Sequence, residues 1–214
     1  GPVESRQKSP HAHMVKPDPD DNYLLVPDLG TDKVEIYAFD RESGLLAPNP
    51  EQAFLKLDPG AGPRHLVFHP TGDFVYVVNE LDATVSCFAH EEGSLTLRQS
   101  VSTRPSGAEG TIQPAAIRMT RRGEYLFVSN RIDNDSIAFF GVDGDSGELT
   151  PLGHVETQGK TPRDFILDDL NDYLIVANQD SNTLVVFEID AVEKRLRPTG
   201  ISTESPSPAG LVLG

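Results

Sequence analysis

Two sets of residues occupy matching positions in four stretches of this sequence, and most of them carry side chains that can do chemistry. Members of one set directly follow a proline, and members of the other directly follow an Asp or Asn that ends an apolar run. The first set is His11, Arg64, Ala115 and Arg163, and the second is Leu29, Glu80, Arg131 and Gln179. Structural residues of a repeat recur unchanged, whereas these differ from one stretch to the next, so they are the candidates for function.

Three arginines in these sets could hold an anion. Arg64, Arg131 and Arg163 each offer a planar guanidinium fork that suits a phosphate or carboxylate, and each could also stabilise an oxyanion. Arg163 is expected to bind substrate, and Glu80 is a candidate general base. The structural alternative is that the arginines bind backbone carbonyls and that Glu80 pairs with one of them.

Two histidines and two amides complete the candidates. His11 and His13 are further candidate bases, and because they are two apart in a predicted strand, both could point to the same side. Gln179 and Asn130 are predicted to bind substrate, although the position of Asn130 holds Asp or Asn in every stretch, which equally favours turn hydrogen bonds. The spacing of His11 and His13 is the only one typical of metal ligands, and no carboxylate set accompanies it. We therefore predict no metal.

An internal repeat must position these residues. Its clearest markers are four aromatic residues at spacings of 51, 51 and 48, namely Tyr23, Phe74, Tyr125 and Tyr173. Each begins a short apolar run, which predicts a strand covered on both faces. Pro-led strands are expected before these runs, within 10–17, 63–70, 114–120 and 162–168. Third strands are expected within 33–40, 84–91, 136–143 and 183–190. Fourth strands are expected to begin near Leu45, Leu95, Leu149 and Leu196.

Four antiparallel strands in every repeat predict an all-β chain, a β-propeller of four-stranded blades with almost no helix. A β-sandwich is the main alternative, but it would not repeat four strands so regularly. The blades are expected at 7–53, 54–104, 105–156 and 157–204, with a closing strand at 205–214. Because that last strand resembles the start of a fifth repeat, we expect further blades before Gly1. Matched positions of successive blades ring one end of a central channel, so the candidates should converge on one polar cup.

The amino-acid composition of the chain narrows the range of possible binding partners. The net charge of −15 repels phosphate backbones and argues against nucleic acid, and no apolar stretch approaches the roughly 18 residues of a membrane helix. Cys87 is the only cysteine, which excludes a disulfide framework and fits the cytoplasm. No cofactor is predicted. Open sheet edges are expected to allow self-association.

Seven segments, in order along the chain, resemble the seven-bladed lactonase propellers. They are RQKSPHAH at 6–13, DLGTD at 28–32, GAGPRHLVFHP at 60–70, VVNE at 77–80, VSNR at 128–131, PRDF at 162–165 and ANQD at 177–180. That family includes the propeller-type 6-phosphogluconolactonases and the fungal 3-carboxy-cis,cis-muconate cyclases. The resemblance implies a seven-bladed ring, of which this chain corresponds to the fourth blade onward.

The same resemblance implies a function in carbohydrate metabolism. It points to a metal-independent lactone hydrolase that converts a small anionic substrate, a phosphorylated sugar lactone, into the sugar acid. A lactonising enzyme like the muconate cyclases, or a non-catalytic binding scaffold, is the alternative. By similarity to the cyclase branch, the site would combine His11 or His13 with Arg64, Glu80 and Arg131.

Overall fold

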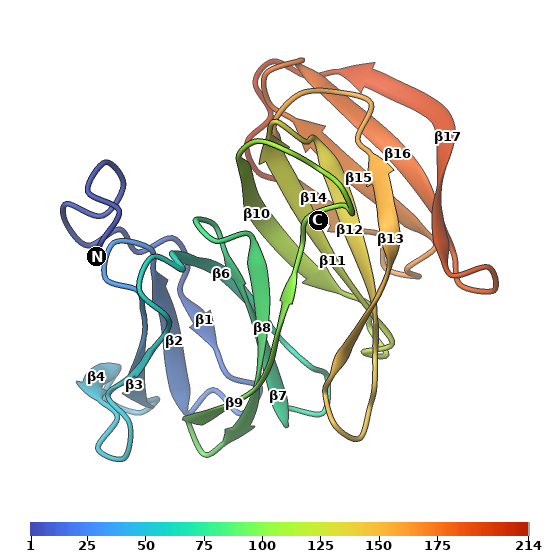
Figure 1. Cartoon of the computed structure of the whole chain (residues 1–214). Helices are drawn as coiled ribbons and strands as arrows, with labels where there is room; N and C mark the ends of the chain where they lie inside the picture. Colours follow the sequence, from blue (N-terminus) through green and yellow to red (C-terminus); the bar gives the residue numbers. More distant parts are fainter. Residues whose placement is uncertain (214) are drawn as a thin grey trace. The chain divides into compact units, whose positions relative to one another are not determined.

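The computed structural model describes residues 1–213, and within them the chain is all-β, without a helix. Its strands form four antiparallel sheets, each built in chain order from a separate part of the sequence (Figure 1). The predicted fold class, a propeller-like array of four-stranded sheets, is thereby confirmed. No helix in the described residues is long and apolar enough to cross a membrane.

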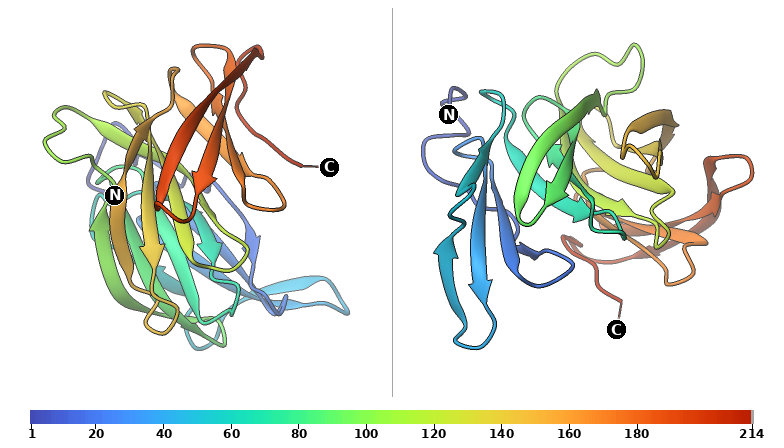
Figure 2. Two further views of the ribbon diagram at one scale, coloured as in Figure 1. Left: turned by 90° about the vertical axis from the view of Figure 1, so that its right-hand side faces the viewer. Right: turned by 90° about the horizontal axis from the view of Figure 1, so that it is seen from below.

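The second, third and fourth sheets each have four strands. The second contains β6 (Pro63–Phe68), β7 (Phe74–Asn79), β8 (Thr84–Glu91) and β9 (Ser94–Ser102). The third contains β10 (Ile112–Met119), β11 (Tyr125–Ile132), β12 (Ser136–Val142) and β13 (Leu149–Glu156). The fourth contains β14 (Pro162–Leu167), β15 (Tyr173–Asn178), β16 (Thr183–Asp190) and β17 (Arg195–Glu204), paired in that order (Figure 1). It is the orange-to-red part of the ribbon in Figure 2.

The first sheet departs from this plan at both edges. It contains β1 (Lys16–Pro17), β2 (Tyr23–Asp28), β3 (Lys33–Asp40), β4 (Leu45–Pro48) and β5 (Phe54–Lys56). Both β4 and β5 pair with β3, so together they take the place of one fourth strand. Pro50 lies in the interruption between them, where the missing N–H of a proline would break a ladder.

The predicted first strand at 10–17 is wrong in extent. Only β1 and an isolated bridge between Ala12 and Asp28 are formed there. The side-chain carboxylate of Asp28 accepts the backbone N–H of His11 at 2.8 Å, which takes that donor out of a strand ladder. The backbone at 10–15 is therefore held by this carboxylate and by two backbone hydrogen bonds, not by a continuous strand.

Within the described residues, 205–213 form no strand, and the closing strand at 205–214 stays a prediction. Two of its backbone N–H groups donate to side chains instead, Ser207 to Asn182 Oδ1 at 2.8 Å and Leu211 to Asp164 Oδ2 at 2.9 Å. Prolines 206 and 208 supply no N–H at all. Residue 214 lies outside the described residues.

The described chain divides into two compact units. The first comprises Gly1–Ser102 with Asp145–Glu148, and the second comprises 103–144 with 149–213. Each unit contains two whole sheets or nearly so, and each has its own core. In the first unit, Leu25 and Ile36 of the first sheet cluster with Leu66, Val77 and Phe88 of the second.

The core of the second unit is aromatic. Phe127 and Phe139 of the third sheet stack with ring centroids 4.8 Å apart, and Phe165 and Phe187 of the fourth sheet belong to the same cluster. Burying one such side chain contributes on the order of 1.5–3 kcal/mol. Each core thus lies between neighbouring sheets, which holds the ends of their strands in place for a site.

Candidate active site

A β-bulge sets Arg64 apart from the rest of its strand. In the second sheet Pro63 pairs with Asn79 and His65 pairs with Val78, so Arg64 is the extra residue. Register shifts fall at the matching place in the third sheet, after Pro114, and in the fourth sheet, after Pro162. Because bulges re-aim a side chain, the position after the proline is the one that the fold presents differently from its neighbours.

Arg64 and Glu80 form a buried ion pair, which the half-buried Arg6 joins. Arg64 Nε lies 2.9 Å from Glu80 Oε2, and Arg6 Nη2 pairs with Glu80 Oε1. Only 4% of Arg64 and 2% of Glu80 are exposed. The backbone N–H of Glu80 donates to the carbonyl of Gly62 at 2.8 Å, which holds the end of β7 beside the start of β6.

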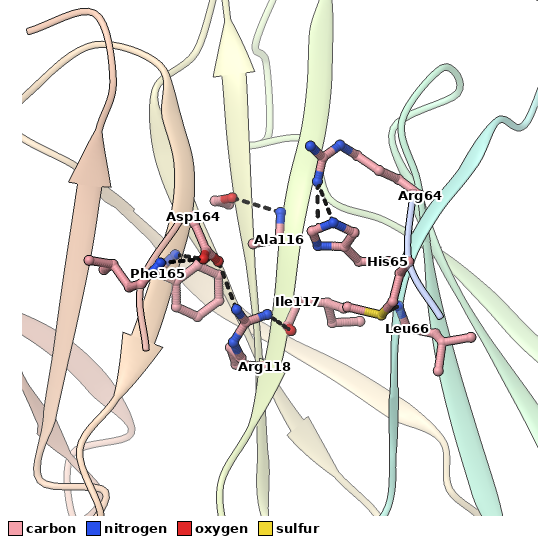
Figure 3. A network of polar contacts seen from close by, with 11 residues as sticks. Arg64, His65, Leu66, Ala116, Ile117, Arg118, Asp164 and Phe165 are labelled. Carbon is pink, nitrogen blue, oxygen red and sulfur yellow. Dashed lines mark hydrogen bonds and ion pairs between the residues drawn. The ribbon is translucent and has the colours of Figure 1, made fainter. Parts of the chain in front are cut away.

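The side chain of His65 completes this cluster. Arg64 Nη1 lies 2.9 Å from His65 Nε2 (Figure 3). The same Nη1 lies 3.3 Å from His65 Nδ1, and because a guanidinium group only donates, the imidazole is the acceptor in this contact. We call the four residues Arg6, Arg64, His65 and Glu80 the arginine cluster.

The arginine cluster carries a net positive charge in a strongly acidic chain. Two guanidinium groups face one carboxylate, while the imidazole nitrogen acts as an acceptor. In a buried, low-dielectric place such a cation can bind an anion or stabilise an oxyanion far more strongly than in water. Because cations occupy both of its oxygens, the Glu80 carboxylate is stabilised as the anion. That geometry favours Glu80 as the group that positions Arg64, and its role as a base stays a prediction.

The two candidate histidines also lie in the first unit, and both are exposed. The carbonyl of His11 accepts the N–H of Leu29 at 3.1 Å, and the N–H of His13 donates to Pro27 at 3.2 Å. These two bonds form the isolated bridge between Ala12 and Asp28, and the expectation that both rings point to one side stays a prediction. Their part in catalysis stays a prediction.

Three further candidates lie in the second unit. Arg131, at the end of β11, is 6% exposed, and its Nε donates to the carbonyl of Gln113 at 3.3 Å. Arg163 is half-buried at the bulge of β14, and the N–H of Gln179 donates to Thr161 at 2.9 Å. The predicted convergence of these residues with those of the first unit on one cup stays a prediction.

Asn130 belongs to a column with a common structural role. Its amide donates to the carbonyl of Thr103 at 2.7 Å, and the amide of Asn178 donates to the carbonyl of Thr157 at 3.1 Å. Among the described residues, the buried Oδ1 atoms of Asn79, Asn130 and Asn178 have no hydrogen-bond partner. The same arrangement in three sheets favours a structural role, so substrate binding by Asn130 stays a prediction.

Sequence reasoning missed two members of the arginine cluster. Arg6 lies before the first repeat, where no strand pattern places it, and its only signal is the segment at 6–13 that carries the family resemblance. His65 follows the bulge residue, and the pattern after each proline could have drawn attention to it. A second ion pair, Arg118 Nη2 to Asp164 Oδ1 at 2.8 Å, lies in the second unit (Figure 3) and also went unpredicted.

Cavities and metal ligands do not locate the site. One pocket of about 110 Å³ in the first unit is lined by Leu57, Asn79 and Ser86 among others, but by neither Arg64 nor Glu80. Among residues 1–213, no group of three or more His, Cys, Asp or Glu side chains is arranged to hold a metal. The arginine cluster is therefore the feature of the described chain that is best suited to chemistry.

The sheets and this cluster define an all-β protein of repeated blades with a cationic site, and comparison with known proteins gives the family. Residues 1–213 match the family described as Lactonase, 7-bladed beta-propeller, and the chain belongs to it.

Individual relatives agree with this assignment. A 6-phosphogluconolactonase of Bacillus subtilis is 37% identical over 210 residues, which are 96% of this chain and 58% of the relative. A 6-phosphogluconolactonase of Formosa agariphila is 33% identical, over 92% of this chain and 56% of its own length. The structure of a periplasmic gluconolactonase of Pseudomonas aeruginosa superposes with a TM-score of 0.91 at 37% identity, covering 95% of this chain and 57% of that one. The chain thus spans less than three fifths of the length of these relatives.

Proposed function

We propose that this chain carries the lactone-opening site of a metal-independent hydrolase that acts on a small anionic sugar lactone, such as 6-phosphogluconolactone. The observation that carries the proposal is the buried arginine cluster, held in place by the β6 bulge and the end of β7. The names of the Bacillus and Formosa relatives support a phosphorylated substrate. The name of the Pseudomonas structure supports a sugar lactone more generally.

The proposed reaction adds water across the ring ester. The oxygen of water bonds to the carbonyl carbon, and the carbonyl oxygen becomes an oxyanion. The bond between that carbon and the ring oxygen then breaks, and the ring oxygen takes a proton to become a hydroxyl, so that lactone and water give one hydroxy acid. Arg64 would donate to the oxyanion, with Glu80 fixing its guanidinium plane, because a preorganised donor stabilises charge at no reorganisation cost.

A phosphate on the sugar would be held by a second cation. Arg6 is the nearest candidate in the cluster, since its guanidinium shares Glu80 with Arg64. Arg163, Arg131 and Gln179 remain candidates from the second unit. A cytoplasmic location fits a phosphorylated sugar, and we include it in the proposal.

The test is the rate at which the lactone ring opens, above the spontaneous rate, for gluconolactone with and without the 6-phosphate. We expect the wild-type chain to accelerate both and to prefer the phosphorylated form. Arg64→Ala should lower the enzymatic rate by about 100-fold, as expected for loss of an oxyanion donor. Arg98→Ala, which removes an exposed arginine of β9, is the matched control and should leave the rate unchanged.

Two results would overturn the proposal. One is a wild-type chain that opens neither lactone faster than buffer, which would favour a non-catalytic binding role. The other is an Arg64→Ala rate equal to that of Arg98→Ala. Equal rates on both lactones would show that the site does not recognise the 6-phosphate, while the proposal of lactone hydrolysis would stand.

A further inference from the structure

One buried carboxylate, that of Asp32, joins two segments that contribute to the arginine cluster. Asp32 directly precedes β3 and is 3% exposed. Its Oδ1 accepts the side-chain N–H of Gln7 at 2.7 Å and the backbone N–H of Gly62 at 2.9 Å, and its Oδ2 accepts the N–H of Gly60 at 2.8 Å. Asp32 thus connects the segment that carries Arg6 with the loop that leads into the β6 bulge.

The side chain of Gln7 uses both ends of its amide. Its Nε2 also donates to the carbonyl of Leu29 at 2.8 Å, and its Oε1 accepts the N–H of Val3 at 2.9 Å. Gln7 is 4% exposed, and an amide that is buried this deeply would be costly without such partners. The backbone N–H groups of Arg6 and Gln7 both donate to the Val3 carbonyl at 2.8 Å, which closes a turn. The amide of Gln7 therefore fixes the turn from which the Arg6 side chain extends.

Arg6 is held at one end of its guanidinium group and open at the other. Its Nη2 pairs with Glu80 Oε1, and no other atom of residues 1–213 bonds this guanidinium group. The side chain of Arg6 is 35% exposed, whereas that of Arg64 is 5% exposed. Because a guanidinium group has N–H donors on each of its nitrogens, Arg6 still offers donors to an anion that approaches from solvent. Phosphate oxygens suit such a fork.

We propose that Gln7, anchored on Asp32, is a positioning residue: it sets the place of Arg6 and thereby the preference of the site for a phosphorylated ligand. The inference rests on the proposed function for the identity of the substrate, whose 6-phosphate meets the open donors of Arg6. Loss of the Gln7 amide releases the turn and the Arg6 side chain, while Arg64 keeps its place in the β6 bulge. A side chain that is fixed before binding loses less conformational entropy on binding, so its release weakens affinity.

Inorganic phosphate is a probe that does not depend on catalysis, and its binding to the whole chain can be followed by phosphorus NMR line broadening. We expect the wild type to bind phosphate and Arg6→Ala to bind it about tenfold more weakly, as for one lost charge-assisted hydrogen bond. Gln7→Met keeps a side chain of similar length without the amide and should show most of that loss.

The matched control is Gln52→Met. The side chain of Gln52 also joins two sheets of the first unit, since its Oε1 accepts the N–H of Leu95 at 2.6 Å, but it lies outside the arginine cluster. Phosphate should bind this variant as it binds the wild type. Circular dichroism should be the same for all variants, because the segment that holds Arg6 and Gln7 contributes no strand.

A double variant separates positioning from a general loss of structure. Because Gln7 acts through Arg6, Arg6→Ala combined with Gln7→Met should bind phosphate no more weakly than Arg6→Ala alone. The two lactones give a second readout, the ratio of kcat/KM for the phosphorylated form to that for gluconolactone. Gln7→Met should lower this ratio, and Gln52→Met should not.

The proposal is overturned by a wild-type chain that binds no phosphate, by a Gln7→Met variant that binds phosphate like Gln52→Met, or by a double variant that binds it several-fold more weakly than Arg6→Ala. Phosphate binding that needs both Arg6 and Gln7, in a chain that opens neither lactone, would support the positioning role and contradict the proposed function. Lactone opening with the same ratio in Gln7→Met and Gln52→Met would contradict the positioning role and leave the proposed function standing.

Discussion

At the residue scale, the arginine cluster shows what a sequence can and cannot reveal about a site. Arg64 and Glu80 stood out because they break the repeat, and the structure brings them within 2.9 Å. Arg6 reaches the same carboxylate from 74 positions away, and no periodicity predicts a contact made by a segment outside the repeat.

Loss of the Glu80 charge should destabilise the first unit. Glu80→Gln would leave two guanidinium groups facing a neutral amide, and removing one partner of a buried ion pair costs about 3 kcal/mol. Urea unfolding measures this cost. Glu91→Gln changes an exposed glutamate at the end of β8 and should cost almost nothing. Equal midpoints for the two variants would show that the cluster does not hold Glu80 as a buried anion.

Cys87 should be inert in the folded chain. Burial raises the pKa of its thiol to about 11, and its Sγ donates to the carbonyl of Gly147 at 3.1 Å. Because the folded thiol holds its proton at pH values where the unfolded one has lost it, this group favours folding below its unfolded pKa, and that contribution is lost as the pH rises toward 11. At mildly alkaline pH, a thiol reagent should modify Cys87 only after urea is added. Rapid modification without urea would contradict the buried position.

At the scale of elements, the aromatic markers predicted the second strands well. In the structure β2, β7, β11 and β15 begin at Tyr23, Phe74, Tyr125 and Tyr173. The prediction worked because a short apolar run is typical of a strand that is covered on both faces. The structure shows this directly at β7, which is buried along its whole length. It failed over most of 10–17, where the Asp28 carboxylate accepts a backbone N–H although the composition still indicates a strand.

Two glycines with the same backbone but different surroundings provide a test at this scale. Gly44→Ala should cost only about 1 kcal/mol for a left-handed alanine. Gly147→Ala adds a β-carbon against the Phe74 ring, and overpacking costs a further 1–3 kcal/mol or so. Both glycines belong to the first unit, so one urea transition reports on both. Equal costs would mean that the Phe74 ring moves aside and that its packing on Gly147 is loose.

At the scale of the whole molecule, the net charge of −15 opposes the binding of an anionic lactone. It repels such a substrate, which makes a buried cationic cluster necessary for binding. The sequence predicted the charge and the repeat, but it could not show that the chain divides into two units, each with its own core. That division depends on which side chains pack across neighbouring sheets.

The central claim is that Arg64 acts through the shape of its guanidinium group. Arg64→Lys keeps the positive charge but loses the planar fork that bonds Glu80 and His65. The deciding measurement is kcat/KM for 6-phosphogluconolactone hydrolysis by this variant and by the wild-type chain. Our account predicts a fall on the order of 100-fold, comparable to the loss of an oxyanion donor. An unchanged kcat/KM would contradict it.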